Sequence, residues 1–266
     1  MTQTAKKVIN NIVGVGIIYR TQNPSEIFLD IKNNGYPMIA YRQHLCLIGG
    51  NWVGETACND ENPMQTFLRE FREEISFDRA EDDPQERFAL FGITEKIQVV
   101  HDPAPPPTKE DLRSLEHLKY EVGKNAITYR DYWHIMPQEA IRRTDPSYAR
   151  GDGKAIFSIN LVPVDEKTWQ ILAFLQEKFK NLSNESITCT LSMDLIIEKN
   201  LKCMAGYDRV LQQFWKECGL AKANEVPLDF EGVVMEELGT PFGSYKDYLE
   251  RYEVTKKPVH SVASAT

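Results

Sequence analysis

The feature that most constrains the fold of this chain is a helical pattern that begins at Asn62-Pro63. An asparagine side chain can cap the first N–H groups of a helix, and proline suits the first helical position because its missing N–H costs no hydrogen bond there. Apolar residues then recur at helical spacing on one stripe, namely Met64, Phe67, Leu68, Phe71 and Ile75. The pattern predicts a helix at about residues 63 to 75 that buries this stripe against a sheet.

The same helix carries three carboxylates on one turn. Glu70, Glu73 and Glu74 stand at positions i, i+3 and i+4, so their oxygens can converge on one point. Arg69 is one turn from Glu73 and can hydrogen-bond to it, but the mutual repulsion of the acids calls for a further partner. A hard cation such as Mg²⁺, which prefers oxygen ligands, would compensate them. The alternative interpretation is a solvated acidic helix face without a ligand, which is what most charge runs are.

An apolar segment with paired glycines precedes the helix. The segment from Leu47 to Glu55 begins as an apolar strand, which is predicted to end in the paired glycines Gly49-Gly50. A further glycine and Glu55 follow. Together with the acidic helix this segment resembles the Nudix hydrolase superfamily, whose motif reads G-x5-E-x7-R-E-U-x-E-E-x-G-U, where U is aliphatic or aromatic. The segment from Arg69 to Phe77 matches every specified position of the second half except the last glycine, where Ser76 stands. If that glycine ends the helix with a left-handed backbone, serine would meet the same conformation only with strain.

The two halves of the motif are further apart than in the family. Gly49 and Glu55 have the family's spacing, but thirteen residues separate Glu55 from Arg69 where the family has seven. The six additional residues, which include Asp60, are predicted to form a hydrophilic bulge, since a surface loop tolerates extra length at little entropic cost. An alternative register takes Glu61 as the first acid, but its glycine would then be one residue out of place.

The resemblance implies a fold and an activity. The implied fold is an α/β/α sandwich with a mixed central sheet and helices on both faces. The implied activity is that of a hydrolase that uses Mg²⁺ or Mn²⁺ to cleave the diphosphate linkage of a nucleoside diphosphate derivative, a small-molecule nucleotide substrate. In such a site the ion neutralises the diphosphate and activates the attacking water. Many members of the family form dimers, so a homodimer is a further expectation.

The resemblance also implies roles for individual residues. Glu73 and Glu74 correspond to metal ligands, Glu70 to a ligand or proton acceptor, and Arg69 to a residue that orients the acids. The carbonyl group of Gly50 or Gly49 would add a ligand, as backbone oxygens at this turn do in the family, and Glu55 is a weaker candidate. A second hypothesis is a binding module on the same fold, in which the loop insertion and the missing glycine have disabled the chemistry. The retained acids favour the enzyme, because a binding module has no need for three mutually repelling carboxylates.

The composition of the chain limits the classes of binding partner and the cellular compartment that are expected for it. A chain of 266 residues with 42% hydrophobic content can bury a full core. Its net charge of -8 disfavours nonspecific binding to nucleic acid or to an anionic membrane surface. Five cysteines without a C-x-x-C pair fit a reducing compartment, and no run reaches transmembrane length. The apolar stretch from Ile9 to Tyr19 reads as a first strand rather than a secretory segment, because Asn10 and Asn11 interrupt it, so a cytoplasmic enzyme is expected.

Hydrophobic periodicity outlines the remaining elements. Strands are predicted at 12–19, 27–31, 38–41, 45–48, 88–100, 126–136 and 155–162, and further helices at 165–179 and 207–218. We assign residues 7–218 to one Nudix-like domain and 219–266 to a C-terminal extension with a short helix around 247–251 and a polar tail. The proline-rich stretch at 101–124 is predicted to be an inserted loop with at best a short polar helix.

Several polar and aromatic residues are candidates for additional site groups. A general base in the late part of the chain would be Glu185, Asp194 or Glu198, although each fits an exposed acid better and none is assigned. The histidines show no zinc-ligand spacing. The aromatic run Tyr129, Tyr132 and Trp133 fits nucleobase stacking or plain alternation on a half-buried strand equally well. For Arg42, Arg142, Arg143 and Arg150, an exposed position is expected more than phosphate binding.

Overall fold

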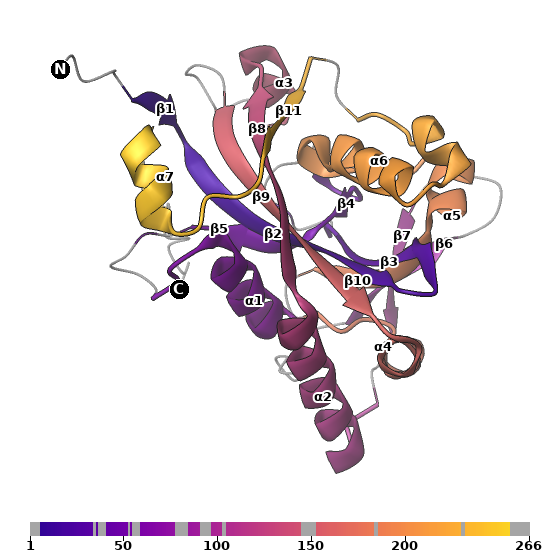
Figure 1. Ribbon diagram of the computed structural model, residues 1–266. Coiled ribbons are helices and arrows are strands. Elements are labelled where there is room, and N and C mark those ends of the chain that lie inside the picture. Colours follow the sequence, from indigo (N-terminus) through magenta and orange to yellow (C-terminus); the bar gives the residue numbers. More distant parts are fainter. Residues whose placement is uncertain are drawn as a thin grey trace, which may run out of the picture.

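The computed structural model describes residues 6–33, 36, 41–52, 54, 59–77, 85–90, 97–102, 105–144, 153–183, 186–229 and 232–255. A mixed sheet of eight strands lies at the centre of this part of the chain (Figure 1). Six of the strands follow the order β10 (Ile187–Ser192), β3 (Asn23–Ile31), β2 (Asn11–Arg20), β9 (Gly153–Val164), β8 (Ile127–Met136) and β11 (Val234–Gly239). The short strands β4 (Leu45–Cys46) and β5 (Ile48–Asn51) pair with β3 and β2. Only β2 and β9 run parallel; the other pairs in this sheet are antiparallel.

Helices cover both faces of this sheet (Figure 1). One face carries α1 (Pro63–Glu74), α2 (Lys109–Asn125) and α4 (Glu166–Phe179), whose apolar side chains share one buried cluster. The other face carries α3 (Gln138–Thr144), α5 (Met193–Glu198) and α6 (Tyr207–Glu217), which contribute to a second cluster. The structure is therefore mixed α/β, as the sequence predicts.

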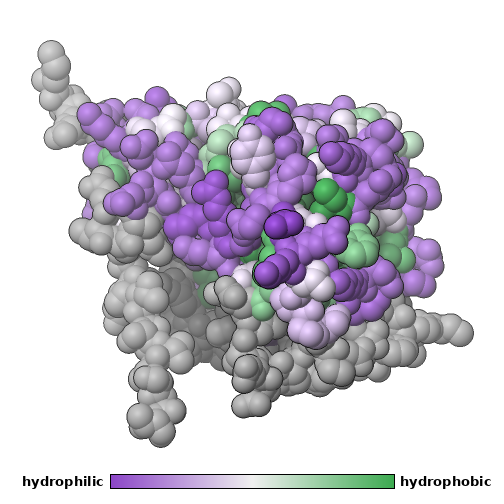
Figure 2. All heavy atoms as spheres, turned by 90° about the horizontal axis from the view of Figure 1, so that it is seen from below, coloured by the Kyte–Doolittle hydropathy of each residue, from purple (hydrophilic) through white to green (hydrophobic). Residues whose placement is uncertain are grey.

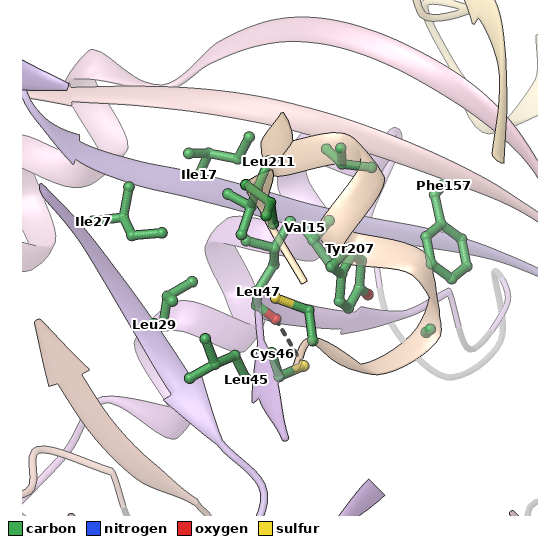
Figure 3. Close-up of a cluster of buried hydrophobic side chains, with 14 of the residues drawn as sticks. Val15, Ile17, Ile27, Leu29, Leu45, Cys46, Leu47, Phe157, Tyr207 and Leu211 are labelled. Carbon is green, nitrogen blue, oxygen red and sulfur yellow. Dashed lines mark hydrogen bonds between the residues drawn. The ribbon is translucent and has the colours of Figure 1, made fainter. Parts of the chain in front are cut away.

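The second cluster is the larger core and lies between the sheet and α6. Val15 and Ile17 of β2 point into it from the middle of the sheet, beside Leu29 of β3, and they meet Tyr207 and Leu211 from α6 (Figure 3). Cys46 belongs to the same core, and its thiol donates to the Leu47 carbonyl at 3.2 Å. Three of the described cysteines, Cys46, Cys189 and Cys203, are buried, as expected of small core residues, whereas Cys218 is exposed.

Most predicted strands are confirmed, and the structure differs from the others in separate ways. The strand predicted at 45–48 is divided at Leu47 into β4 and β5, and the one predicted at 88–100 is a hairpin of β6 (Gln85–Leu90) and β7 (Ile97–Asp102) around residues outside the description. Of the strand predicted at 38–41, only Tyr41 is described, and it is not in a strand. The unpredicted strand β11 is an edge strand with exposed acids, so it lacks the apolar alternation by which strands are recognised.

The prediction for the proline-rich stretch is wrong beyond its first residues. Residues Lys109–Asn125 form α2, a helix of 17 residues. It begins with a capping box in which Thr108 and Asp111 each bond to the other's backbone N–H. The buried residues Leu115, Leu118 and Val122 form a narrow apolar stripe that the high density of charges obscures in the sequence. Lys178 of α4 binds Asp111 at 2.6 Å and joins the two helices.

The C-terminal residues pack onto the N-terminal part of the chain. Strand β11 pairs with β8, and β12 (Tyr252–Val254) pairs in parallel with β1 (Lys7–Ile9). Between them, α7 (Tyr245–Arg251) covers Ile12 and Trp52 in a third buried cluster. The predicted short helix is thus present, and the tail beyond residue 255 lies outside the described residues.

The surface of the described part is hydrophilic over most of the view from below, and its hydrophobic residues lie in small separate patches (Figure 2). Leu112, Tyr120 and Phe174 are among the exposed large hydrophobic side chains. None of the helices described here combines the length and the hydropathy that a membrane span requires.

Two glycines of β2 let α1 lie directly on the sheet. A Cβ atom at Gly14 would come within 2.1 Å of the Pro63 carbonyl oxygen, and one at Gly16 would come within 2.3 Å of the Phe67 ring. Both distances are shorter than any ordinary contact, so a side chain at either position would push the helix away. The glycines therefore fix the height of α1 above the sheet, and with it the position of the acids that follow.

Candidate functional site

The acidic helix begins and ends as local sequence dictates. The Asn62 side chain accepts a hydrogen bond from the Gln65 N–H, and Pro63 occupies the first turn, which confirms the predicted N-terminus. The last helical residue is Glu74, and Ile75 is already extended and pairs with Ser183. Ser76 does not adopt a left-handed backbone, and its N–H donates to the Leu182 carbonyl. The expectation of strain at Ser76 is therefore wrong, because the chain leaves the helix through an extended bridge.

Arg69 is the centre of the site and binds three carboxylates. Its Nε donates to Asp60 at 2.9 Å, one terminal nitrogen donates to Glu73 at 2.9 Å, and the other lies 2.8 Å from Glu70. Burial opposes the charge of the guanidinium, but Asp60 and Glu70 outweigh this effect and raise the pKa of Arg69 above its ordinary value. These contacts hold Glu70 and Glu73 on the same guanidinium, and the role of Arg69 in orienting metal-binding acids stays a prediction.

Asp60 was not singled out from the sequence, where it is only one polar residue of the insertion. In the structure its carboxylate accepts from both Arg69 and the Thr66 hydroxyl, and its side chain is 9% exposed. No local signal marks Asp60 in the sequence, because a side-chain pair nine positions apart across the start of a helix has no periodic signature. The six-residue insertion is therefore anchored to the acidic helix at this point.

The two halves of the motif meet at Gly50 and Glu70. A Cβ atom at Gly50 would lie 2.4 Å from the Glu70 carboxyl carbon, so the acid packs against the bare backbone of that glycine. The turn expected at these glycines is absent, because Gly49 and Gly50 both lie in β5 and pair with Val15 and Gly14 of β2. Gly49 has a φ of +136°, and a Cβ there would come within 2.2 Å of the Gly14 carbonyl oxygen. Gly50 and Glu70 are thus neighbours in space although the loop insertion lies between them in the sequence.

The three glutamates differ in their surroundings. The Glu73 side chain is 58% exposed, the Glu70 side chain is 20% exposed, and Glu74 is buried at the end of the helix. Glu74 lies close enough to Lys32 to affect its charge: burial alone would lower the pKa of Lys32, but Cys46, Asp30 and Glu74 raise it above its ordinary value. Lys32 in turn lies 3.9 Å from Asp30. Glu74 is therefore part of a buried charged group beneath the helix, whereas Glu70 and Glu73 share Arg69.

The acidic side chains are too dispersed to form a cluster of metal ligands in the described part of the chain. Among the residues that the structure describes, no three or more His, Cys, Asp and Glu side chains come together closely enough to hold a metal ion. Glu55, the weaker ligand candidate, lies outside those residues. Glu61, the acid of the alternative register, is exposed, and its backbone N–H and carbonyl bond to Gln65 and Tyr245.

Comparisons with protein-family models, with curated proteins and with solved structures give no match. Assignment to the Nudix superfamily is therefore a proposal that depends on the motif and on the geometry of its residues.

Other residues considered from the sequence do not join the site. Asp194 and Glu198 are exposed acids of α5, on the opposite face of the sheet, where they pair with Lys222 and Lys199; Glu185 lies outside the described residues. Tyr132 and Trp133 of β8 alternate, since Tyr132 is buried in the cluster beneath α6 and Trp133 stacks on Tyr252 on the other face. Tyr129 packs against the same cluster as Tyr132, because the strand register shifts between Thr128 and Arg130, and its hydroxyl donates to Glu217. Arg42 bonds to the Tyr36 carbonyl, and the side chains of Arg142, Arg143 and Arg150 lie outside the description.

Two histidines occupy contrasting environments on the α6 face. Both ring nitrogens of His44 meet acceptors, the Arg42 carbonyl at 3.1 Å and the Asp229 carboxylate at 3.0 Å. A neutral ring donates from one nitrogen only, so this arrangement favours the cation, and although burial opposes it, Asp229 raises the pKa of His44. His134 is 5% exposed and stacks on Phe157, and burial, with a smaller contribution from Arg209, lowers its pKa to about 4.

The lowered pKa of His134 predicts a loss of stability in mild acid. Between pH 6.5 and pH 4 the unfolded chain binds a proton at this residue and the folded chain does not, so the free energy of unfolding falls as the pH falls through this window. The loss reaches about 3 kcal/mol if the whole shift is realised. We expect His134→Phe, which keeps a ring on Phe157, to show a flatter profile in urea unfolding at pH 4.5, 5.5, 6.5 and 7.5. Parallel profiles for the two proteins would contradict the prediction.

Proposed function

We propose that the protein is a metal-dependent hydrolase of the Nudix type, which cleaves the diphosphate linkage of a nucleoside diphosphate derivative. The observation that carries this proposal is the contact between Gly50 and Glu70. A site made from both halves of the motif needs the glycines and the acidic helix side by side, and here Gly50 of β5 lies against Glu70 of α1 in spite of the insertion between them in the sequence. Arg69 binds Glu70 and Glu73 on the adjacent turn, in the orienting role that the resemblance implies.

The donor chemistry fits a hard cation, although no three acidic side chains of the described residues lie close enough together to share one ion. Glu70, Glu73 and the Gly50 carbonyl would hold the ion, and Glu74, the remaining motif acid, would contribute negative charge from its buried position. When bound, Mg²⁺ or Mn²⁺ would neutralise the diphosphate and lower the pKa of a water molecule. Arg69 would keep Glu70 and Glu73 in place, and the exposure of Glu73 leaves this edge of the site open to substrate.

The net charge of the chain favours a substrate site in which a few local groups, and not the overall field of the protein, bind the phosphates. A protein with a net charge of -8 does not attract phosphates by its overall field, so the affinity has to come from the metal ion and a few cations near it. The same charge supports the proposal that nucleic acid and membrane surfaces are not partners. The homodimer and the cytoplasmic location stay predictions.

A second function is favoured by one observation, namely that Arg69 already pairs with Glu70, Glu73 and Asp60. A guanidinium that balances the acids removes much of the repulsion that a metal ion would otherwise offset. The alternative is therefore a catalytically impaired Nudix-fold module that binds a nucleotide or a protein.

Measurements of turnover and of metal binding distinguish the hydrolase from the binding module. The full chain would be assayed with Mg²⁺ and with Mn²⁺ against nucleoside diphosphate sugars, ADP-ribose, dinucleoside polyphosphates and nucleoside triphosphates, and Mn²⁺ binding would be measured by calorimetry. We expect metal-dependent release of a nucleoside monophosphate from at least one class of compound. Nucleotide binding without turnover would favour the binding module, and the absence of Mn²⁺ binding with and without nucleotide would overturn the hydrolase proposal.

A further inference from the structure

A hydrogen-bonded chain links the C-terminal helix α7 to the acidic helix α1. The Tyr245 hydroxyl lies 2.5 Å from the Thr66 hydroxyl, which lies 3.0 Å from an Asp60 carboxylate oxygen. The same Asp60 oxygen accepts from Arg69 Nε at 2.9 Å. Four side chains from three separate segments thus form one chain of hydrogen bonds. The chain ends at the Arg69 guanidinium, which binds Glu70 and Glu73.

Chemistry fixes the direction of this chain. An ionised carboxylate accepts hydrogen bonds and cannot donate, so the Thr66 hydroxyl must use its only proton toward Asp60. Tyr245 must then donate to the Thr66 oxygen. Every proton points toward Asp60, and each bond polarises the next one, which strengthens the hold of Asp60 on Arg69.

The chain is buried and both of its ends are packed. Thr66 is fully buried and Tyr245 is 3% exposed. The Tyr245 ring stacks on Trp52 with centroids 4.6 Å apart, and its backbone N–H donates to the Glu61 carbonyl at 2.8 Å. Trp52 directly follows β5, the strand that carries Gly50. Tyr245 therefore contacts the residue after β5, the inserted loop and the acidic helix α1. Water competes poorly for such bonds, so removal of one hydroxyl leaves a buried polar atom without its partner.

We propose that Tyr245 is a positioning residue for the site on α1, acting through Thr66 and Asp60 on Arg69. This inference rests on the proposed function for its consequence, because the group that is positioned holds the expected metal-binding acids. The C-terminal segment is then a component of the site although it contributes no ligand to it. Loss of the Tyr245 hydroxyl loosens Arg69 and lowers the affinity for the metal ion without changing the contacts to a nucleotide.

Tyr245→Phe tests this proposal because it removes the hydroxyl and keeps the ring on Trp52. Exchange of the Arg69 Nε–H with water would be measured by NMR on the ¹⁵N-labelled full chain, and the affinity for Mn²⁺ by calorimetry. We expect exchange at least about 10-fold faster and an Mn²⁺ affinity about 10-fold lower, the range typical of residues that orient metal ligands. If the variant turns over substrate, the metal dependence should shift and the KM for the nucleotide should not.

Matched variants distinguish positioning from a loss of packing. Thr66→Val removes the second hydroxyl at constant shape and should reproduce the effects of Tyr245→Phe, whereas Thr66→Ser keeps the hydroxyl and should restore slow exchange. Tyr248→Phe removes a hydroxyl from the same helix, but one that donates to Asp131 at 2.7 Å, and should leave both measurements at wild-type values.

The failure of this inference and the failure of the proposed function give different results. Slow Arg69 exchange in Tyr245→Phe, together with unchanged Mn²⁺ affinity, would overturn the positioning role. A wild-type protein that binds no Mn²⁺ and cleaves no nucleotide would overturn the hydrolase, and the exchange rate would then decide alone whether Tyr245 positions Arg69.

Discussion

Glu70→Gln is expected to lower turnover of any substrate by at least about 100-fold, because replacement of groups that only orient metal ligands already lowers affinity or activity 10- to 100-fold. Glutamine keeps the length of the side chain, so it still fits against Gly50. What it loses is the negative charge that faces the expected ion and the charged contact with Arg69 at 2.8 Å. Initial rates at saturating and at limiting Mg²⁺ would show whether the loss lies in metal affinity or in the chemical step.

The control for this substitution is Glu177→Gln on α4, an exposed acid that pairs only with Lys180 among the ion pairs of the described residues. It makes the same change of charge on a helix of the same face and should retain full activity. Urea unfolding of Glu177→Gln should stay within about 1 kcal/mol of the wild type, since surface ion pairs contribute little. The same measurement on Glu70→Gln shows that any loss of turnover occurs in a folded protein. Equal turnover by the wild type and Glu70→Gln would remove Glu70 from the site.

Gly14→Ala is expected to lower the free energy of unfolding by about 1–3 kcal/mol or more, although it adds only one methyl group. The new Cβ would lie 2.1 Å from the Pro63 carbonyl oxygen, and this obstacle is backbone that cannot rotate away. Helix α1 must therefore rise from the sheet, which loosens the packing of Phe67 and shifts Glu70 relative to Gly50. We expect a lower midpoint in thermal unfolding and a loss of any activity that depends on the site.

The same substitution elsewhere should have the opposite sign. Gly123 lies inside α2, and a Cβ there would meet only the end of the Arg72 side chain, at 3.3 Å. Because alanine is the better helix former, Gly123→Ala should raise stability by about 0.5–1 kcal/mol. If both variants were equally stable, close packing of α1 on β2 would not be what requires glycine at position 14.

Local patterns in the sequence determined the elements that carry clear periodicity or caps. The N-cap at Asn62 and the apolar stripe of α1 are contained within a few neighbouring residues, so they could be recognised without a fold. The turn expected at Gly49-Gly50 is wrong, because pairing with the distant strand β2 keeps both glycines in β5. The 17 residues of α2 escaped recognition because three buried apolar positions were outnumbered by charges, and β11 because an edge strand need not alternate. Both elements are stabilised by contacts with distant segments.

For the site, the sequence determined which residues stand on the acidic helix and that they are acids at helical spacing. Only the tertiary structure decided how those acids differ, because burial depends on what packs against each one: Glu74 lies in a buried charged group near Lys32, whereas Glu70 and Glu73 share Arg69. Only the structure placed Asp60 on Arg69 and linked Tyr245 to that pair through Thr66. The hydrogen bond between Tyr245 and Thr66 joins residues about 180 positions apart, so it leaves no mark in local periodicity. The chemistry of each side chain is local, but its charge, neighbours and role are set by the segments that the fold places around it.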